Sequence, residues 1–257
     1  MIDKVVPTFD AAVADIVDGA VIHFGGFASP FNTPNLLIAA LARNGAGGLT
    51  AISTWMGTGA ELDRRRAEAL AHLLDWPADS FDIGYLAELG RIRRAITSFP
   101  AASSPRDRAP FERLLEAGAA EVEVIGQGSL AERIRAARAG IAAFYTPVGP
   151  GTFVAEGKEL RDFDGVAHVL EHALHADFAL IRAQRADRFG NLVFHGPRSF
   201  NETMAGAATV TIAEVDEVVP LGTLEPDAIH VAGVYVQRVV VRPPHAATVP
   251  VSWREPR

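Results

Sequence analysis

The stretch that decides the fold is "DGAVIHFGGFASPFNTPNLLIAALARNGAGGLTAIST", residues 18–54. It begins with a short apolar segment, Ala20–Phe24, which stops at two adjacent glycines as a buried strand would. A polar, proline-containing loop follows, and then an amphipathic helix is predicted over Asn35–Asn44, closed by Gly45. A second apolar segment, Leu49–Thr54, predicts another strand. This strand–loop–helix–strand order predicts two parallel strands joined by a right-handed crossover.

The rest of the chain continues the alternation of strands and helices. We expect six to eight strands, several of them continuously apolar, as is typical of strands covered on both faces. The predicted fold class is α/β: a single domain over residues 1–257, with a mostly parallel central sheet and helices on both faces. Further strands are predicted within residues 91–99, 120–126, 178–183, 189–196, 208–219 and 234–241, and helices at Thr8–Val17 (with Thr8 as N-cap), Ala60–Trp76 and 129–140; residues 141–147 are apolar and lead into a loop.

Composition excludes several classes of function. The chain has no cysteine, which excludes disulfides, thiolate nucleophiles and cysteine-ligated zinc. Its net charge is −7, with arginines spread among acids, which argues against a nucleic-acid surface. Apolar runs fall short of the roughly 18 residues of a membrane span, and acids stand where a signal peptide needs a basic and then apolar start. We therefore expect no membrane association and a cytoplasmic location.

The adjacent glycines Gly25 and Gly26 raise the question of a nucleotide loop. A dinucleotide fingerprint needs G-x-G-x-x-G and an acid at the end of the next strand. Here the third glycine is missing and the next strand ends in Ser53-Thr54-Trp55, so that interpretation fails. A sharp turn remains, or a backbone wall where a ligand approaches too closely for a Cβ atom.

The segment "GQGSLAERIRAARAG", residues 126–140, follows a predicted strand and opens a helix. Gln127 stands between two glycines, and Ser129 could cap the helix, which would place an amide and free N–H groups where an oxyanion or carboxylate could bind. Taken alone, the pattern slightly favours an ordinary capped loop. The arginines of this helix are expected to form a solvated basic face.

Other motifs favour structural roles. "VAHVLEHALHAD", residues 166–177, contains H-x-x-E-H, the order of an inverted zinc-protease helix, but no third ligand stands nearby, so we expect a helix packed on the sheet and no metal site. Gly190-Asn191 predicts a hairpin turn between strands. Gly149-Pro150-Gly151 predicts a shaped loop, which could line a site or act as a stiff connector.

Taken together, five segments resemble the α (A) subunit of family I coenzyme A transferases, especially the 3-oxoacid type. They are "DGAVIHFGGF", "GQGSLAERIRAARAGIAAFYTPVGPGT", "ADFALIRAQRADRFGNLVF", "FNETMAGAATVTIAEVDEVV" and "LEPDAIHVAGVYVQRVV". The second is the most specific, and the order and spacing of all five match the family over most of the chain.

The sequence departs from that pattern in three places. The glycine loop is one residue longer and carries Asn32 where the family has glycine, and Ser53-Thr54-Trp55 replaces a pair of asparagines. The segment 55–113 is longer than usual, and a tail begins at about residue 244. The three departures lie where acyl groups would be sensed, so they leave the substrate open.

The resemblance implies half of a two-subunit enzyme that moves CoA from an acyl-CoA to a short carboxylic acid, a 3-oxo acid or a dicarboxylate. A glutamate on the β partner would be the nucleophile in a ping-pong covalent mechanism. CoA would be a substrate, with no permanently bound cofactor, and the assembly a heterodimer or heterotetramer. Gln127 matches the family's oxyanion or carboxylate donor; the residues expected at the substrate are Gly25, Gly26, Phe27, Ala28, Asn32, Gly128, Ser129, Gly149 and Gly151.

Two other functions stay open on the same scaffold. One is a component of a CoA-thioester hydrolase or of a C–C-cleaving enzyme, because a fold does not fix the chemistry of its site. The other is a non-enzymatic binding module. Transfer needs a β partner and an acceptor acid, hydrolysis needs only water as acceptor, and a binding module would give no turnover.

Overall fold

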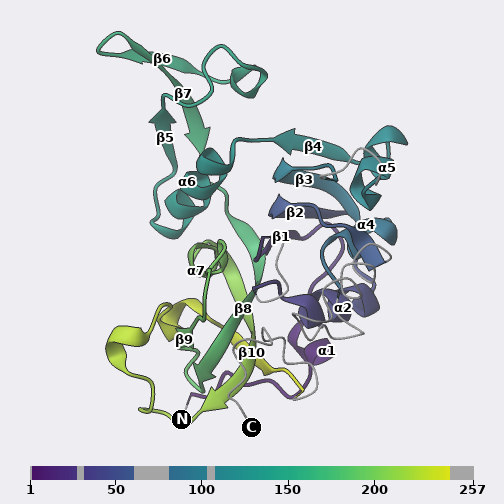
Figure 1. Ribbon diagram of the computed structural model, residues 1–257, viewed down its shortest axis with the longest axis vertical. Helices are drawn as coiled ribbons and strands as arrows, with labels where there is room; N and C mark the ends of the chain where they lie inside the picture. The colour runs from purple at the N-terminus through teal and green to yellow at the C-terminus, as the bar shows by residue number, and fades with distance from the viewer. Residues whose placement is uncertain (1, 28–31, 61–80, 103–107, 244–257) are drawn as a thin grey trace.

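The computed structural model describes residues 2–27, 32–60, 81–102 and 108–243. Their main feature is an eight-stranded sheet, seven strands of which run parallel in one path while β9 pairs antiparallel with β8 (Figure 1). The predicted α/β class is confirmed. In spatial order the strands are β11 (Arg238–Val241), β10 (Ala208–Val219), β8 (Ala176–Asp187), β1 (Val21–Phe24), β2 (Leu49–Trp55), β3 (Ile92–Phe99) and β4 (Glu121–Val124), with β9 (Leu192–Val193) beside β8.

β1 and β2, the two strands predicted within the stretch 18–54, lie in the middle of this sheet, and their predicted parallel pairing is confirmed. β1 pairs in parallel with β2, where Ile22 lies opposite Ala51. On its other side β1 pairs with β8, where Ile22 lies opposite Phe178. The helix between β1 and β2 ends at Gly45, whose positive φ of 90° closes it in the left-handed region that glycine enters at low cost.

Helices cover both faces of the sheet, and each face has its own apolar core. One core joins α1, α2, α4 and α5 to side chains such as Ile22 and Leu180. The other joins α6 and α7 to Ala179 and Ile181, the alternate residues of β8. The helices are α1 (Phe9–Ala12), α2 (Asn35–Asn44), α4 (Gly84–Glu88), α5 (Pro110–Glu116), α6 (Gln127–Arg138) and α7 (Asn201–Met204), with short 3-10 turns η1 (Phe153–Ala155), η2 (Pro226–Ala228) and η3 (Gly233–Tyr235).

A second, three-stranded antiparallel sheet projects from the body (Figure 1). We call it the arm: β5 (Ala143–Thr146), β6 (Leu160–Phe163) and β7 (Val166–His172), in the order β5-β7-β6. The helix predicted over residues 166–177 is therefore wrong, because its first part is a strand. In a strand, His168 and His172 lie about 13 Å apart along the chain direction, so they do not form the i, i+4 face of a helical zinc motif.

Several predicted boundaries also differ. Thr8 caps α1 as predicted, since its Oγ1 accepts from Ala11 N at 3.1 Å, but the helix ends at Ala12. The chain continues as a turn in which Ile16 N donates to Val13 O at 3.1 Å. The predicted 178–183 strand is longer, because β8 spans Ala176–Asp187.

The remaining predictions of the fold have mixed outcomes. The hairpin turn at Gly190-Asn191 is confirmed by the β8–β9 pair. Residues 61–76 of the predicted helix at Ala60–Trp76 and the tail from residue 244 lie outside the described residues. In the part of the chain that is described, no helix has the length and apolarity to cross a membrane.

Candidate functional site

The Gly25–Gly26 turn leaves β1 at the carboxyl edge of the sheet. Gly25 N donates to Leu180 O at 2.9 Å, and Gly26 N donates to Ser199 O at 3.1 Å. A Cβ atom at Gly25 would overlap Asn201 Oδ1 and lie 3.3 Å from Leu180 O. Close approach of protein backbone and side chain, together with a φ of 95° at Gly26, explains why glycines occupy this turn.

Asn201, the first residue of α7, holds this turn in place. Its side chain is fully buried; Oδ1 accepts from Arg182 N at 2.9 Å and Nδ2 donates to Asn32 O at 2.8 Å. Asn32 in turn donates to Ser199 Oγ at 2.7 Å and accepts from Phe27 N at 3.3 Å. Asn32 thus clamps the two ends of the loop, and the predicted residue Ala28 between them lies outside the described residues.

Substitution Gly25→Ala should destabilise the protein by about 1–3 kcal/mol, because the added methyl must displace Asn201 from its hydrogen bonds. Chemical denaturation followed by circular dichroism measures the change. Gly47→Ala is the matched control, because a Cβ there would meet its nearest neighbour at 3.9 Å. We expect the free energy of unfolding of the control to stay within about 0.5 kcal/mol of the wild-type value. An equal effect of the two substitutions would contradict the role of Asn201 in holding the Gly25 turn.

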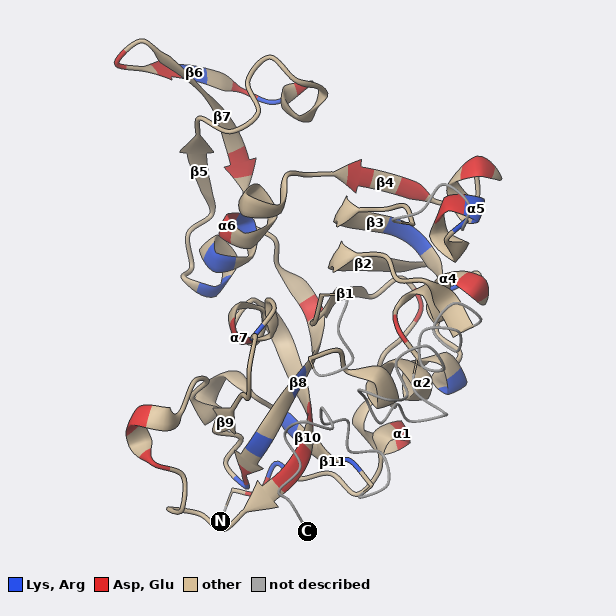
Figure 2. Ribbon diagram, in the orientation of Figure 1, with Lys and Arg blue, Asp and Glu red and all other residues tan. Residues whose placement is uncertain are grey.

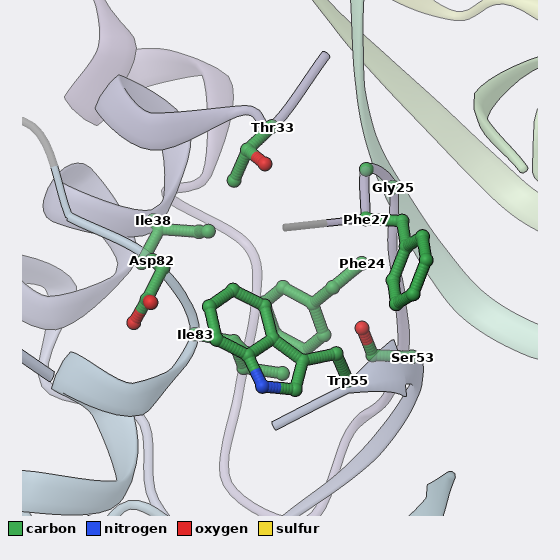
Figure 3. Close-up of a pocket in the computed structure, with 10 residues that line it drawn as sticks. Phe24, Gly25, Phe27, Thr33, Ile38, Ser53, Trp55, Asp82 and Ile83 are labelled. Carbon is green, nitrogen blue, oxygen red and sulfur yellow. The ribbon is translucent and has the colours of Figure 1, made fainter. Parts of the chain in front are cut away.

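A pocket opens beside this turn, at the carboxyl ends of β1 and β2 (Figure 3). Three predicted residues, Gly25, Gly26 and Phe27, form part of its wall. Trp55 belongs to the Ser53-Thr54-Trp55 segment that was expected near the acyl group but was not named as a binding residue, and Asp82 was not predicted. Its space is about 260 Å³, counted out to the open solvent. It is lined by Phe24, Gly25, Gly26, Phe27, Thr33, Ile38, Ser53, Trp55, Asp82 and Ile83.

Asp82 is the acid of this pocket, and it is 5% exposed. Its carboxylate accepts from Thr58 N at 2.7 Å, Thr58 Oγ1 at 2.9 Å, Gly59 N at 3.1 Å and Gly84 N at 2.8 Å. Burial raises the pKa of Asp82, and the hydrogen bonds from Thr58, Gly59 and Gly84 oppose that rise. These bonds join the end of β2 to the start of α4, so Asp82 fixes one wall of the pocket.

Gln127 lies elsewhere on the same edge of the sheet, at the first turn of α6. The side chain of Gln127 and the neighbouring Gly128 are exposed, while Ser129 is buried. The prediction that Ser129 caps the helix is wrong, because the N-cap is Gly126 and no side chain caps α6. Strands β2 and β3 separate β4, which leads into α6, from β1. At the usual spacing between neighbouring strands, β4 and β1 are therefore about 14 Å apart across the sheet.

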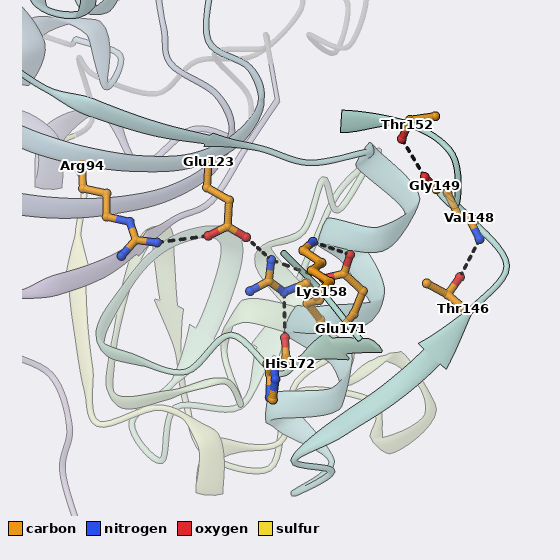
Figure 4. Close-up of polar contacts among 10 residues, drawn as sticks. Arg94, Glu123, Thr146, Val148, Gly149, Thr152, Lys158, Glu171 and His172 are labelled. Carbon is orange, nitrogen blue, oxygen red and sulfur yellow. Dashed lines mark hydrogen bonds and ion pairs between the residues drawn. The ribbon is translucent and has the colours of Figure 1, made fainter. Parts of the chain in front are cut away.

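Arg133 anchors α6 to the arm, which corrects the expectation of a solvated basic face. Its guanidinium donates to Glu123 at 2.5 Å and to His172 O at 2.7 Å, and lies 3.6 Å from Glu171 (Figure 4). Glu171, 1% exposed, also pairs with Lys158 at 2.7 Å. Figure 2 shows acidic residues in both β4 and β7 and basic residues in α6. The arm is therefore tied to the helix that carries Gln127.

Gly149 and Gly151 lie in the loop that follows β5 on the arm. Both have positive φ, 104° and 79°. Thr152 Oγ1 donates to Gly149 O at 2.7 Å, and Val148 N donates to Thr146 Oγ1 at 3.3 Å (Figure 4). These bonds shape the loop, as predicted for a glycine–proline–glycine sequence, but neither glycine lines the pocket of Gly25 and Phe27. The predicted residues thus fall into three groups, at the pocket, at α6 and on the arm.

Comparison with known proteins adds the family context. The family model described as "Coenzyme A transferase" matches residues 6–242. The α (A) subunit of the 3-oxoadipate CoA-transferase of Pseudomonas putida is 44% identical over 93% of this chain and 94% of its own length. The α (A) subunit of the succinyl-CoA:3-ketoacid coenzyme A transferase of Xanthomonas campestris is 44% identical over 90% and 86%. A solved structure of a variant of the decarboxylase AibA/AibB superposes with a TM-score of 0.72 at 26% identity, covering 95% of this chain and 85% of that one.

Proposed function

The chain belongs to the coenzyme A transferase family, and on that premise we propose that it is the α subunit of a two-subunit 3-oxoacid CoA-transferase. The observation that carries this function is the 44% identity to α-subunit relatives over nine-tenths of the chain. Relatives that are named as one of two subunits imply a β partner, so the chain acts as one part of a heteromer. We expect a heterodimer or heterotetramer in the cytoplasm.

The reaction exchanges a thioester between two carboxylates. A glutamate carboxylate of the β partner attacks the acyl-CoA carbonyl, and the CoA thiolate leaves to give a mixed anhydride. The thiolate attacks the glutamyl carbonyl, which releases the first acid and forms a glutamyl-CoA thioester. The acceptor carboxylate then attacks this thioester, which expels CoA thiolate and forms a second mixed anhydride. The thiolate attacks the new acyl carbonyl of that anhydride, and the glutamate carboxylate leaves in its original form. Bonds balance without water or a redox partner, so CoA is a substrate and no step calls for a resident cofactor.

This chain supplies residues that surround the reacting groups in those steps. Each tetrahedral intermediate carries an oxyanion, which aligned donors stabilise. We assign the Gln127 amide, which is exposed at the start of α6, as such a donor, because the N-terminal end of that helix also favours negative charge. The Gly25–Phe27 backbone forms the acyl wall, and Gly149 and Gly151 let the arm loop approach the glutamate of the β partner.

The alternative of hydrolysis or C–C cleavage is not favoured. The decarboxylase structure is 26% identical to this chain, whereas the α-subunit relatives named for CoA transfer are 44% identical. Hydrolysis or C–C cleavage would also give a different product from CoA transfer when the assembled enzyme is assayed.

The test mixes the purified chain with its β partner and supplies acetoacetyl-CoA as donor, with butyrate or succinate as acceptor. We expect butyryl-CoA or succinyl-CoA only when both proteins and an acceptor are present, because the nucleophile and its surroundings lie on different chains. Each protein by itself is the control. Release of free CoA without acceptor would instead support a hydrolase, and loss of a carbon–carbon bond a decarboxylase; either would overturn the transferase.

A further inference from the structure

The pocket beside Gly25 is apolar at its base. Phe24, Ile38 and Ile83 line it with 1%, 1% and 4% of their surfaces exposed. Figure 3 shows the rings of Phe24, Phe27 and Trp55 gathered on one side of the pocket. Apolar side chains therefore form the part of the wall that lies deepest below the surface.

An aromatic rim continues these walls toward solvent. The rings of Phe27 and Phe99 stack with centroids 5.7 Å apart and an angle of 23° between their planes. Trp55 and Phe99 lie opposite each other where β2 and β3 end. Phe27 and Phe99 remain 37% and 43% exposed, so an entering ligand can cover apolar surface on both.

Among the described residues that line the pocket, none supplies a positive charge for a second carboxylate. The pocket's described polar side chains are Thr33, Ser53, Trp55 and Asp82, and none of the residues found to line it is Lys or Arg. The backbone N–H groups of Gly59 and Gly84 already donate to Asp82. Asp82 is neutral or negative in either protonation state, so it repels an anion or leaves it without a counter-charge. A carboxylate that enters such a pocket loses water and meets no counter-charge among the described lining residues.

We propose that this pocket selects the acyl group of the transfer reaction and takes an uncharged apolar tail in preference to one that ends in a second carboxylate. The proposal rests on the transferase function and adds the substrate class. It sets this chain apart from a relative named for 3-oxoadipate, whose tail ends in a carboxylate. Trp55, Phe27 and Phe99 are then specificity-determining residues.

The test compares two acceptors that differ only at the end of the tail, 3-oxohexanoate (methyl) and 3-oxoadipate (carboxylate). With the assembled enzyme and acetoacetyl-CoA as donor, we expect kcat/KM to be at least roughly 10-fold higher for 3-oxohexanoate. Calorimetry of the assembled enzyme without a CoA donor should show tighter binding of 3-oxohexanoate as well. Equal values, or a preference for 3-oxoadipate, would overturn the proposal and leave transfer to butyrate or succinate, and so the proposed function, intact.

Two variants place a cation in the pocket or at its rim, Trp55→Arg and Phe99→Arg. We expect each to reduce the preference for 3-oxohexanoate by about tenfold or more, because a guanidinium can pair with the second carboxylate. Phe99 is at the exposed rim, so its variant remains informative if Trp55→Arg fails to fold.

The control Val17→Arg adds the same charge at a residue that is 66% exposed and precedes β1, at the opposite edge of the sheet. A shift in preference no larger than that of Val17→Arg would overturn the proposal. Selective binding of 3-oxohexanoate without turnover would support the pocket while contradicting the transferase.

Discussion

Replacement of Gln127 by alanine is expected to lower kcat of the assembled enzyme by roughly 10²–10³-fold, the usual effect of removing one oxyanion donor. Gln127 is exposed on the first turn of α6, where the helix N-terminus also favours negative charge. Its amide would act on the oxyanion of each tetrahedral intermediate, so the loss should fall on kcat more than on KM. Gln127→Glu should be at least as damaging, because a carboxylate of similar size repels the same oxyanion.

The control for Gln127 lies further along the same helix. Glu132 is exposed and pairs at 2.8 Å with Arg135, which is also exposed, so Glu132→Ala should leave kcat within about twofold. Co-elution of each variant with the β partner in size-exclusion chromatography shows whether assembly is intact. A Gln127→Ala enzyme that assembles and keeps the wild-type kcat would place the oxyanion donor on another residue.

The core of the fold could be predicted from the sequence because its strands are apolar and its turns carry glycine. In residues 18–54, the spacing of apolar residues and the glycines at the segment ends fit a strand–helix–strand unit. The structure has those elements with boundaries that agree to within one residue. The arm was missed because β7 buries a charge. Glu171 points inward to Lys158 and Arg133, so the alternation of a strand did not show as alternating hydrophobicity.

The site was less accessible to prediction, because its side chains are brought together only by tertiary structure. Gly25 and Phe27 could be identified from the adjacent glycines after a strand. Asn201 contacts Gly25 from a helix far along the chain, and Asp82 acts through backbone N–H groups that carry no sequence signature. Gln127 was singled out by its place before a helix, but its catalytic assignment depends on the resemblance to a family.

A buried network of charged side chains supports α2 from β10, which lies on the side of β1 away from β2. Glu214 of β10 is fully buried; its Oε2 accepts from Leu36 N and Leu37 N, each at 3.0 Å, and its Oε1 pairs with the fully buried Arg242. Because Pro34, the N-cap of α2, has no capping side chain, Glu214 supplies that cap from a distant strand.

The same network continues to Asp216 on β10. Asp216 pairs with Arg182 at 3.0 Å and with Arg242 at 3.4 Å. Burial raises the pKa of Asp216, and the charge and hydrogen bond of Arg182 oppose this rise. Two carboxylates and two guanidinium groups therefore balance one another beneath α2, and the loss of one leaves a buried charge without its partner.

Glu214→Ala is therefore expected to lower the free energy of unfolding by about 3–5 kcal/mol, the usual effect of removing one partner of a buried ion pair. Two N–H groups at the start of α2 lose their acceptor, and the Arg242 guanidinium loses the Glu214 carboxylate. Glu214→Gln should be less damaging, because its amide oxygen can still accept from Leu36 and Leu37. Glu217→Ala is the control on the same strand: Glu217 is exposed, and its removal should change stability by no more than about 0.5 kcal/mol. Urea denaturation of the four proteins measures these differences, and equal midpoints for Glu214→Ala and Glu217→Ala would show that α2 does not depend on this carboxylate.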